Sequence, residues 1–310
     1  MKALVLGASG FLGSYAGFAL NAAGWTVTGA SRKPLEWYPS VALIEKLDDV
    51  PSLIRGGNWD VIINCVALAN HEACEEKPEE ARLLNVELPA LWAAVAGESS
   101  ARFVHFSTDA VFDGKSNVPY GEGDFASPPS VYGRTKLQGE QAVLAANSQA
   151  LVFRTNFFGW SQSGEKGILD FFARGIETGT AMTGFSDYIV SSLYTGDLFD
   201  LLVEAVRKEA AGLFHLTSST PLSKYDFGIV VAQALEGDVS LVQQGLLAEQ
   251  STLGNRGHNL GLSVTKLHEL LGHSIPSTIQ GIARALAERQ AVMDYFGGMG
   301  MGMGMGMGQK

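Results

Sequence analysis

The chain has 310 residues, of which 46% are hydrophobic, and it carries a formal net charge of −10. This length allows one large domain or two coupled ones, and the negative charge argues against nucleic acid and membranes as partners. Two cysteines, Cys65 and Cys74, fit a reducing compartment, and no His/Cys spacing indicates a metal site. Neither a signal peptide nor an apolar run of about 18 residues is evident, so we expect a cytoplasmic protein.

A glycine-rich turn lies near the start of the chain. Residues 3–6 form an apolar run that predicts a buried strand, residues 14–20 are helix-like, and residues 25–29 predict a second strand. Between the first strand and the helix, glycines recur in a Gly-x-x-Gly-x-x-Gly pattern. Such glycines let the backbone approach a pyrophosphate, whose charge meets the helix N-terminus. The cofactor-binding residues predicted in this turn are Gly7, Ser9, Gly10, Phe11, Leu12 and Gly13.

The end of the second strand indicates which nicotinamide cofactor binds. An acidic residue there would accept the ribose hydroxyls of NAD, but this chain has Ser31-Arg32-Lys33. Arg32 can form a bidentate hydrogen bond with a 2′-phosphate, and Ser31 can donate a hydrogen bond to the same phosphate. We therefore predict NADP(H), with NAD(H) as the alternative if Arg32 and Lys33 are merely solvated loop charges.

Strand and helix patterns then alternate along the chain. Strands are predicted over 41–44, 59–67, 103–108 and 150–154, and helices over 79–96 and 131–146. Alternation of this kind predicts an α/β fold with a doubly wound, Rossmann-like parallel sheet. Ligands bind at the carboxyl ends of such strands. The polar residues placed there are Asn64, Thr108, Asp109 and Asn156.

The pattern loosens after about residue 160, which indicates a second unit. We predict a dinucleotide-binding domain over 1–159 that carries the catalytic residues, and a smaller α/β substrate lobe over 160–296. One strand of this second region is expected to return to the main sheet, and Ser223 is expected to cap a helix. Residues 297–310 alternate Met and Gly and are predicted to be disordered.

Tyr132 and Lys136 lie four residues apart, and therefore on one face of the helix predicted over 131–146. A phenol ionises near pH 10, too high for a useful acid at neutral pH. A nearby ammonium would lower that pKa, so the pair predicts proton transfer at a carbonyl or alcohol.

Four features occur in chain order: the glycine turn, Ser107-Thr108-Asp109, Tyr132-x-x-x-Lys136, and Arg154-Thr155-Asn156. Together they resemble the extended short-chain dehydrogenase/reductase superfamily. Two longer stretches, 106–114 and 131–140, are similar to dTDP-4-dehydrorhamnose reductases, which reduce the 4-keto group of a nucleotide-activated 6-deoxy sugar. The resemblance covers roughly residues 1–290.

The resemblance implies a role for each catalytic residue. Tyr132 would protonate the substrate oxygen while the nicotinamide delivers hydride. Lys136 would hold the nicotinamide ribose and depress the Tyr132 pKa. Thr108 would hydrogen-bond the substrate oxygen, and Asn85 would complete the proton relay. Further predicted contacts are Asp48, Asn64, Ala67 and Asn85 with the cofactor, and Asp109, Asn156 and Arg256 with the substrate. Asp48 as a helix cap and Arg256 as a surface charge remain the alternatives.

One residue departs from the pattern of the resembling enzymes. The reductases usually have Tyr after the Thr-Asp pair, and the related 4,6-dehydratases have Glu, but this chain has Ala110. Without the Glu, we do not expect the protein to be a dehydratase. Without the Tyr, the sequence does not specify the reductase subfamily.

The predicted function is an NADP(H)-dependent reductase of a nucleotide-diphospho 4-keto-6-deoxy sugar. A second enzyme hypothesis is a sugar-nucleotide epimerase that retains its NAD. A third, of another class, is a non-catalytic regulatory subunit such as the beta subunit of methionine adenosyltransferase. The expected partner is the sugar nucleotide, and a homodimer is left open.

Overall fold

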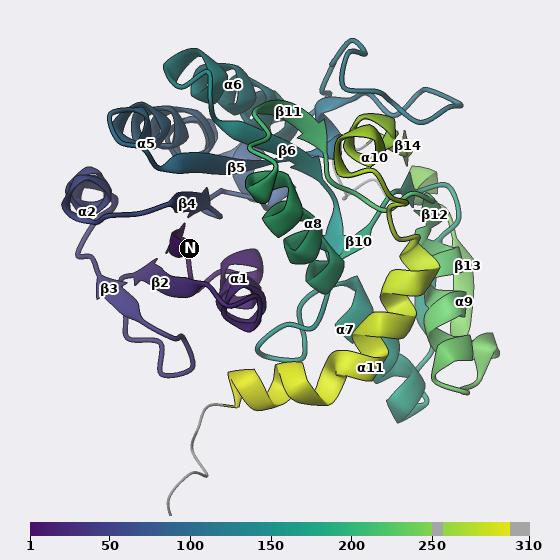
Figure 1. Cartoon of the computed structure of the whole chain (residues 1–310). Helices are drawn as coiled ribbons and strands as arrows, with labels where there is room; N and C mark the ends of the chain where they lie inside the picture. The colour runs from purple at the N-terminus through teal and green to yellow at the C-terminus, as the bar shows by residue number, and fades with distance from the viewer. Residues whose placement is uncertain (250–256, 298–310) are drawn as a thin grey trace, which may run out of the picture.

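The computed structural model of the chain describes residues 1–249 and 257–297. Figure 1 shows a large twisted sheet with helices packed against it and a second group of elements beside it. Arg256 and nearly all of the predicted Met/Gly tail lie outside the described residues. Among the described residues, no helix is both long and apolar enough to cross a bilayer.

The large sheet has seven strands, and every pairing in it is parallel. In order across the sheet, the strands are β11 (Gly212–His215), β6 (Leu151–Thr155), β5 (Arg102–Thr108), β4 (Val61–Asn64), β1 (Lys2–Leu6), β2 (Thr26–Ser31) and β3 (Val41–Leu43). The order reverses at β1, which lies between β2 and β4. This arrangement confirms the predicted doubly wound sheet and opens a crevice at the carboxyl ends of β1 and β4.

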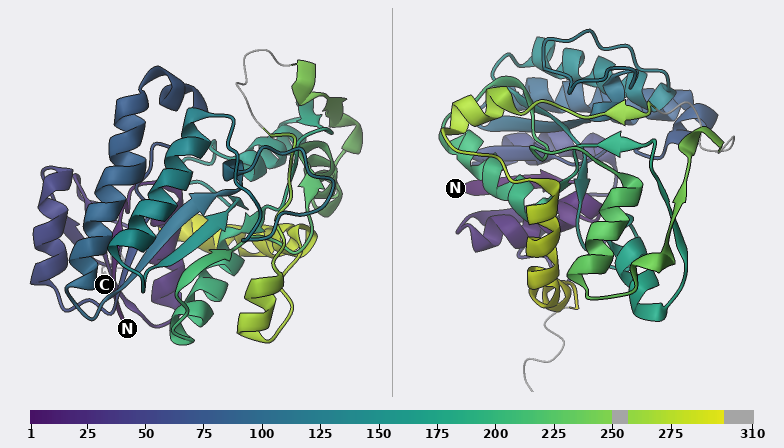
Figure 2. Two further views of the ribbon diagram at one scale, coloured as in Figure 1. Left: turned by 90° about the horizontal axis from the view of Figure 1, so that it is seen from above. Right: turned by 90° about the vertical axis from the view of Figure 1, so that its right-hand side faces the viewer.

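Alternate strand residues bury two separate cores, one on each face of the sheet. Val5 and Ile63 belong to the core beneath α1 (Phe11–Ala22) and α8 (Thr195–Arg207). Leu4 and Ile62 belong to the core beneath α2 (Val50–Gly56), α5 (Leu88–Gly97) and α6 (Val131–Ala146). Figure 2 shows helices on both faces of the sheet. Burial on both faces explains why these strands read as continuous apolar runs in the sequence.

The helix predicted over 79–96 is present and contains a π-helical turn. It consists of α4 (Pro78–Arg82), a π-helical turn (Leu83–Glu87) and α5, and it follows the short α3 (His71–Glu76). Asn85 lies in the π turn, where its amide accepts from Leu68 N at 2.9 Å and donates to Leu68 O and to Thr135 Oγ1, both at 3.1 Å. The wider turn therefore directs a buried amide toward α6 and the segment after β4.

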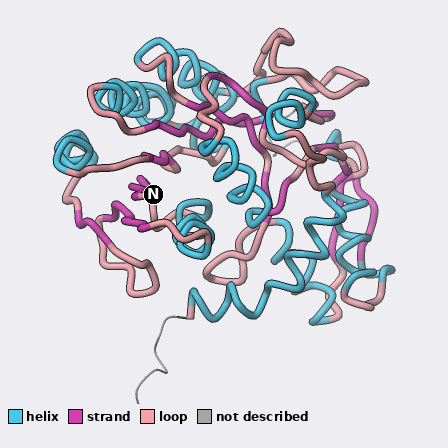
Figure 3. Tube along the Cα trace, in the orientation of Figure 1, coloured by secondary structure: helices cyan, strands magenta, loops and turns pink. Residues whose placement is uncertain are grey.

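Within its described residues, the second unit holds three small sheets. Its strands are β7 (Phe157–Phe158), β8 (Met182–Phe185), β9 (Ile189–Val190), β10 (Leu193–Tyr194), β12 (Leu222–Ser223), β13 (Val242–Gly245) and β14 (Asn259–Leu260). They pair as β10-β7, β12-β9-β14 and β13-β8. Figure 3 shows several of these short strands on the right, beside α9 (Lys224–Ala234) and away from most of the large sheet. The other helices here are α7 (Ile168–Thr178), α10 (Thr265–Leu271) and α11 (Thr278–Phe296).

Ser223 caps α9, as predicted: its Oγ accepts from Asp226 N at 2.9 Å and donates to the Asp226 carboxylate at 2.6 Å. The cap fixes where α9 begins. It therefore also fixes the position of Lys224, the first residue of the helix.

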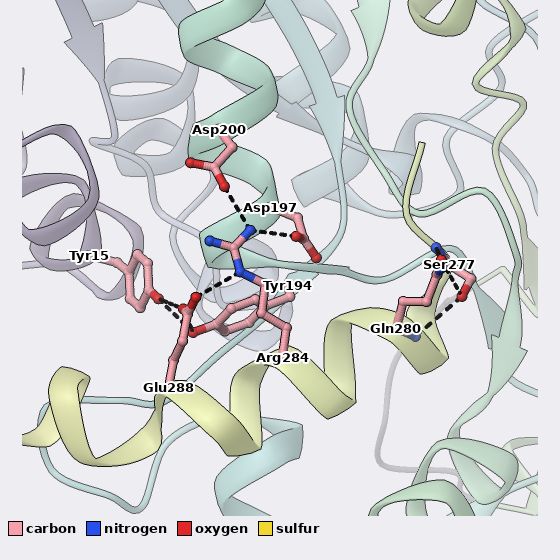
Figure 4. A network of polar contacts seen from close by, with 8 residues as sticks. All are labelled: Tyr15, Tyr194, Asp197, Asp200, Ser277, Gln280, Arg284 and Glu288. Carbon is pink, nitrogen blue, oxygen red and sulfur yellow. Dashed lines mark hydrogen bonds and ion pairs between the residues drawn. The ribbon is translucent and has the colours of Figure 1, made fainter. Parts of the chain in front are cut away.

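Helix α11 joins the second unit to the large sheet. Figure 4 shows Arg284 between two carboxylates of α8, with Nη1 at 2.7 Å from both Asp197 and Asp200. One turn along, Glu288 accepts from Tyr194 at 2.9 Å, and Arg284 Nε donates to it at 2.7 Å. The Tyr15 hydroxyl of α1 lies 2.6 Å from that of Tyr194. We call these six residues the α11 network.

The far end of α11 packs on the segment after β2. The rings of Tyr295 and Phe296 lie 5.8 and 5.7 Å from that of Trp37, centre to centre. The neighbouring Tyr38 donates its hydroxyl to Gly13 O at 3.2 Å. One helix thus contacts both the lobe and the segment that follows Ser31 and Arg32, the residues predicted to bind the 2′-phosphate.

Candidate active site

The glycine turn has the geometry that a phosphate-binding turn requires. Gly7 has a φ of +80°, a conformation that residues with a Cβ rarely adopt. A Cβ built on Gly13 would lie 2.2 Å from Gly7 O, so only glycine allows α1 to start this close to β1. The turn thereby brings the N-terminus of α1 to the crevice between β1 and β4.

The N-terminus of α1 has donors available for an anion. No side chain caps Gly10, the N-cap residue, and the first turn carries no acidic residue. The first N–H groups of a helix have no partner within the helix, and the helix dipole favours negative charge there. A hollow of about 90 Å³ lies here, between Ser9 of the turn and Lys166 of the segment before α7. These residues fit a dinucleotide pyrophosphate. Sequence reasoning missed Lys166, because nothing local marks an exposed loop lysine as a neighbour of this turn.

The residues predicted for the adenosine end lie after β2 and β3. Arg32 and Lys33 are exposed, whereas Ser31 is buried and its Oγ accepts from Lys33 N at 3.2 Å. Asp48 is exposed and lies 3.8 Å from Lys46 Nζ. Arg32 is therefore accessible to a phosphate, and contacts of Arg32 and Asp48 with a cofactor stay predictions.

Thr108, Tyr132 and Lys136 come together at the carboxyl end of β5. Thr108 is the last residue of β5, and Tyr132 and Lys136 lie on one face of α6, which packs on that strand. Ser130 caps α6 by accepting from Gly133 N at 3.1 Å. The Thr108 hydroxyl is near enough to the Tyr132 phenol to oppose the rise in the pKa of Tyr132. The hydroxyls of Thr108 and Tyr132, which are far apart in the sequence, therefore lie near each other at the end of β5.

The pKa of Tyr132 is raised in the structure, whereas Lys136 was expected to lower it. Burial raises the pKa of Tyr132 to about 12, the charge of Asp109 adds to the rise, and the Thr108 hydrogen bond opposes it. Lys136 is not among the groups that shift the pKa of Tyr132, and its Nζ donates to Phe106 O at 2.6 Å. Burial lowers the pKa of Lys136 itself to about 8. In the protein alone, Tyr132 is thus a fully protonated phenol at neutral pH.

A buried ion pair between α6 and β6 lies beneath this site. Glu140 on α6 accepts from Arg154 on β6 at 2.8 and 2.9 Å, and from Ser107 on β5. Both side chains are at most 5% exposed. The pair ties two strands to the helix that carries Tyr132 and Lys136, so it fixes the height of α6 over the sheet.

Three other predicted cofactor residues lie near the end of β4. Asn64 is buried: its Nδ2 lies 3.0 Å from His105 Nδ1, and its Oδ1 accepts from Val66 N at 2.9 Å. Ala67 is half-buried in the following segment, and Asn85 contacts Leu68 and Thr135 as described. Asn64 and Asn85 both shape the segment that lines the crevice. Direct contact of Asn64, Ala67 or Asn85 with a cofactor stays a prediction.

Asp109 heads a second polar cluster, on the substrate side. Asn156 Nδ2 donates to Asp109 Oδ2 at 2.8 Å, and Ser192 Oγ donates to Asn156 Oδ1 at 2.6 Å. Burial raises the pKa of Asp109 to about 6, and the positive charge of Lys224 opposes the rise. Burial likewise lowers the pKa of Lys224 to about 8. The predicted contacts Asp109 and Asn156 are thus adjacent, while Arg256 lies outside the described residues.

Lys224 was missed by sequence reasoning. It appears in the sequence as one residue of a helix start, and only the fold brings α9 toward Asp109. In the structure it is partly buried, with Nζ 5.6 Å from the centre of the Tyr188 ring. A lysine at a helix N-terminus is unfavourable for the helix dipole, which is the one local signal that could have marked it.

The remaining histidine and cysteine candidates are packing residues. His105 is fully buried, and burial lowers its pKa well below the ordinary value, so the ring is neutral. Burial raises the pKa of Cys65 to about 12, so it is a thiol rather than a thiolate. Among the described residues, no group of three or more His, Cys, Asp or Glu side chains could hold a metal ion.

A larger hollow lies at the opposite edge of the sheet. It measures about 480 Å³ and is lined by residues at the amino ends of the strands, among them Asp60, Arg102 and Gln149. Ligands in parallel α/β sheets bind at the carboxyl ends instead. We therefore place the site beside Thr108.

Comparisons with known proteins agree with this geometry. The model of the RmlD substrate binding domain family matches residues 1–291. The chain is 31% identical over 301 residues to the probable low-salt glycan biosynthesis reductase Agl14 of Haloferax volcanii, covering 95% of this chain and 99% of that protein. It is 32% identical over 247 residues to a dTDP-4-dehydrorhamnose reductase of Mycolicibacterium smegmatis, covering 78% of this chain and 72% of the relative.

A solved structure shares the fold. The dTDP-4-dehydrorhamnose reductase of Bacillus anthracis, determined in complex with NADP, superposes with a TM-score of 0.82 at 21% identity and covers 93% of this chain and 99% of that one. The relatives are reductases, as the resemblance implied. The chain therefore belongs to the family of the RmlD substrate binding domain, and it is an oxidoreductase of the short-chain dehydrogenase/reductase type.

Proposed function

We propose that the protein is an NADP(H)-dependent reductase of a nucleotide-diphospho 4-keto-6-deoxy sugar, with Tyr132 as the general acid. The observation that carries the proposal is the meeting of Thr108, Tyr132 and Lys136 at the end of β5. This point lies on the same edge of the sheet as the open N-terminus of α1, which would hold the cofactor pyrophosphate.

The chemistry follows from these residues. The nicotinamide, when bound, supplies hydride to the carbonyl carbon. Negative charge then develops on the carbonyl oxygen, which needs a proton and a donor aimed at it. Tyr132 is protonated at neutral pH and can give that proton, while the Thr108 hydroxyl orients the oxygen. General acid catalysis of this kind contributes roughly 10²–10⁴ in rate.

Cofactor preference rests on Arg32. Its exposed guanidinium follows β2, where a 2′-phosphate would lie, and no carboxylate occupies residues 31–33. The NADP bound by the Bacillus anthracis reductase supports the same choice. Arg32→Ala should weaken NADPH binding by about tenfold or more and leave NADH binding nearly unchanged, because only NADPH carries that phosphate. Equal losses for both cofactors would contradict the assignment.

The substrate class rests on the cluster around Asp109. Asp109, Asn156, Ser192 and Lys224 supply hydrogen-bonding groups suited to sugar hydroxyls. Ala110 has a smaller side chain than the Tyr that the resembling reductases carry after the Thr-Asp pair. The Mycolicibacterium smegmatis relative is named for a dTDP-activated keto sugar, which supports a nucleotide-diphospho 4-keto sugar here.

Turnover tests the proposal directly. We expect loss of NADPH absorbance with one or more members of a panel of 4-keto-6-deoxy sugar nucleotides, and none with Tyr132→Phe. A folded wild-type protein that is silent with the whole panel would refute the reductase assignment. Cofactor that copurifies in equimolar amount and does not exchange would instead favour the epimerase hypothesis.

A further inference from the structure

The ring of His71 packs against the ring of Tyr132. The two ring centres lie 4.6 Å apart, and the ring planes are inclined by 49°. This separation is near the lower limit for packed aromatic rings, and such contacts favour particular orientations of the two rings. His71 is the first residue of α3, whereas Tyr132 lies in the first turn of α6. The contact therefore joins two helix starts that are far apart in the sequence.

Helix α3 is held against the start of α6 by contacts of its own. The Asn70 side chain caps α3 by accepting a hydrogen bond of 2.7 Å from the backbone, which fixes where His71 lies. One turn further on, Glu75 Oε1 accepts from Val131 N at 2.8 Å. Val131 N is in the first turn of α6, where the N–H groups have no partner within the helix. Contacts on both sides of His71 thus fix its position relative to α6.

The segment just before α3 is also tied to α6. The Asn85 amide accepts from Leu68 N and donates to Leu68 O, and it donates to Thr135 Oγ1 on α6 as well. Thr135 Oγ1 in turn donates to Tyr132 O at 3.0 Å. These hydrogen bonds place the backbone of Tyr132 relative to the segment that leads to His71. They do not act on the phenol, whose ring is packed by His71.

A general acid must keep its hydroxyl within hydrogen-bond reach of the oxygen that it protonates. Tyr132 is half-buried, so its surroundings do not enclose the side chain on every side. A displacement of about 1 Å in a reacting group can cost roughly 10²-fold in rate. A flat ring packed against the phenol restricts its rotation, and the phenol then points in one direction before the substrate binds.

We propose that His71 is a positioning residue for the reaction: its imidazole ring holds the Tyr132 phenol in place at the end of β5. The inference rests on the proposed function, in which Tyr132 is the acid. In this role His71 contributes the flat face of its ring, and the proton transfer stays with Tyr132. Another flat ring at this position should therefore serve as well.

Removal and replacement of the ring test the proposal. His71→Ala should lower kcat by about tenfold or more and leave the KM for the sugar nucleotide and the Kd for NADPH within about twofold of wild type, because the phenol acts in proton transfer rather than in binding. His71→Phe keeps a flat ring and should restore kcat to within about threefold of wild type. His273→Ala is the matched control: this histidine contacts Glu204 of α8, and kcat should stay as in wild type.

Other results would overturn the proposal. An unchanged kcat in His71→Ala would show that the phenol does not depend on the ring. A kcat for His71→Phe as low as that of His71→Ala would assign the effect to the imidazole nitrogen atoms rather than to packing. A loss confined to KM or Kd would make His71 a binding residue. These comparisons require an active wild type, so they differ from failure of the proposed function, in which wild type itself is silent.

NMR of the wild-type protein gives a readout that needs no turnover and no variant of His71. With the tyrosine and histidine rings isotopically labelled, the Tyr132 resonance is identified by its absence in Tyr132→Phe. We expect a nuclear Overhauser contact between this ring and a histidine ring, because the centres of the two rings are 4.6 Å apart. Absence of the contact would refute the proposal, whatever the activity.

Discussion

The α11 network and the active-site cluster, by which we mean Asp109, Lys136 and Lys224 with their neighbours, both bring several charged side chains together. They differ in which groups contact each charge. Arg284 contacts three carboxylates, and Glu288 accepts from Tyr194 as well as from Arg284. In the active site, Lys136 donates to a carbonyl, and Asp109 accepts from neutral groups. Burial shifts the pKa values of Lys136, Asp109 and Lys224 toward neutral pH.

The difference separates groups that hold the fold from groups that can change protonation. A charge with close opposite charges keeps its protonation state over a wide pH range, whereas a buried charge without them gives it up easily. The pKa values of Tyr194 and Arg284 in the network are shifted away from neutral pH, whereas those of Lys136 and Lys224 are shifted toward it, as expected of groups that exchange protons at a functional site. The contrast predicts that substitutions in the α11 network affect stability and that substitutions in the active-site cluster affect turnover.

The largest expected effect is that of Tyr132→Phe. It removes the proton but keeps the ring, so kcat should fall by about 10²–10⁴ while the Kd for NADPH and the unfolding midpoint stay close to wild type. Turnover and cofactor fluorescence titration measure the two quantities. Retention of most of the activity would show that another group is the acid.

The second effect is on stability, at the floor of the site. Glu140→Gln removes the charge that faces Arg154, which is buried with it, so the free energy of unfolding should fall by about 3–5 kcal/mol. Urea unfolding checks this. Glu98→Gln, in the exposed pair with Arg55, is the control and should cause no measurable change. A loss no larger than that of the control would mean that the buried pair does not fix α6.

The third effect is a pH dependence of stability. Burial lowers the pKa of Lys136 to about 8 from its ordinary 10.5, so between these values the unfolded chain binds more protons than the folded protein. The free energy of unfolding therefore rises with pH between about pH 8 and 10.5. Below about pH 8 the folded protein bears the full cost of burying the charged Lys136 ammonium. Lys136→Met should remove part of the rise in urea unfolding measured at successive pH values. An identical rise in both proteins would contradict the pKa shift.

The smallest effect is expected at the α11 network. Arg284 is 36% exposed, so solvent screens its ion pairs, and Arg284→Ala should lower the free energy of unfolding by only about 1 kcal/mol. Its kcat should not change, because the network lies away from Thr108 and Tyr132. If kcat of Arg284→Ala fell together with its stability, the α11 network would affect turnover as well, and the proposed distinction between the two regions would be wrong.

Much of the large sheet could be predicted from sequence, because each strand is buried on both faces and reads as an apolar run. The site residues at strand ends were also predictable, since parallel strands place their carboxyl ends together. Asp109, after β5, and Asn156, after β6, are near one another for this reason.

Other features depend on contacts that no local pattern reveals. The π turn at 83–87 follows from the contacts of Asn85 with Leu68 and Thr135, which are distant in sequence. Lys224 and Lys166 are important because of what the fold brings near them. The lowering of the Tyr132 pKa by Lys136 was expected from their spacing, yet Lys136 points to Phe106 O, a partner that spacing alone does not specify.

The place of β11 has a practical consequence for anyone who wishes to study the two units apart. This strand comes from beyond residue 159 but pairs with β6 over four residues, from Gly212 with Leu151 to His215 with Arg154. A fragment ending at 159 would lack it and would expose the backbone of β6 as an open edge, which invites aggregation. Expression of either half alone should therefore give insoluble material, and a protein prepared for ligand-binding measurements needs residues from both sides of the boundary.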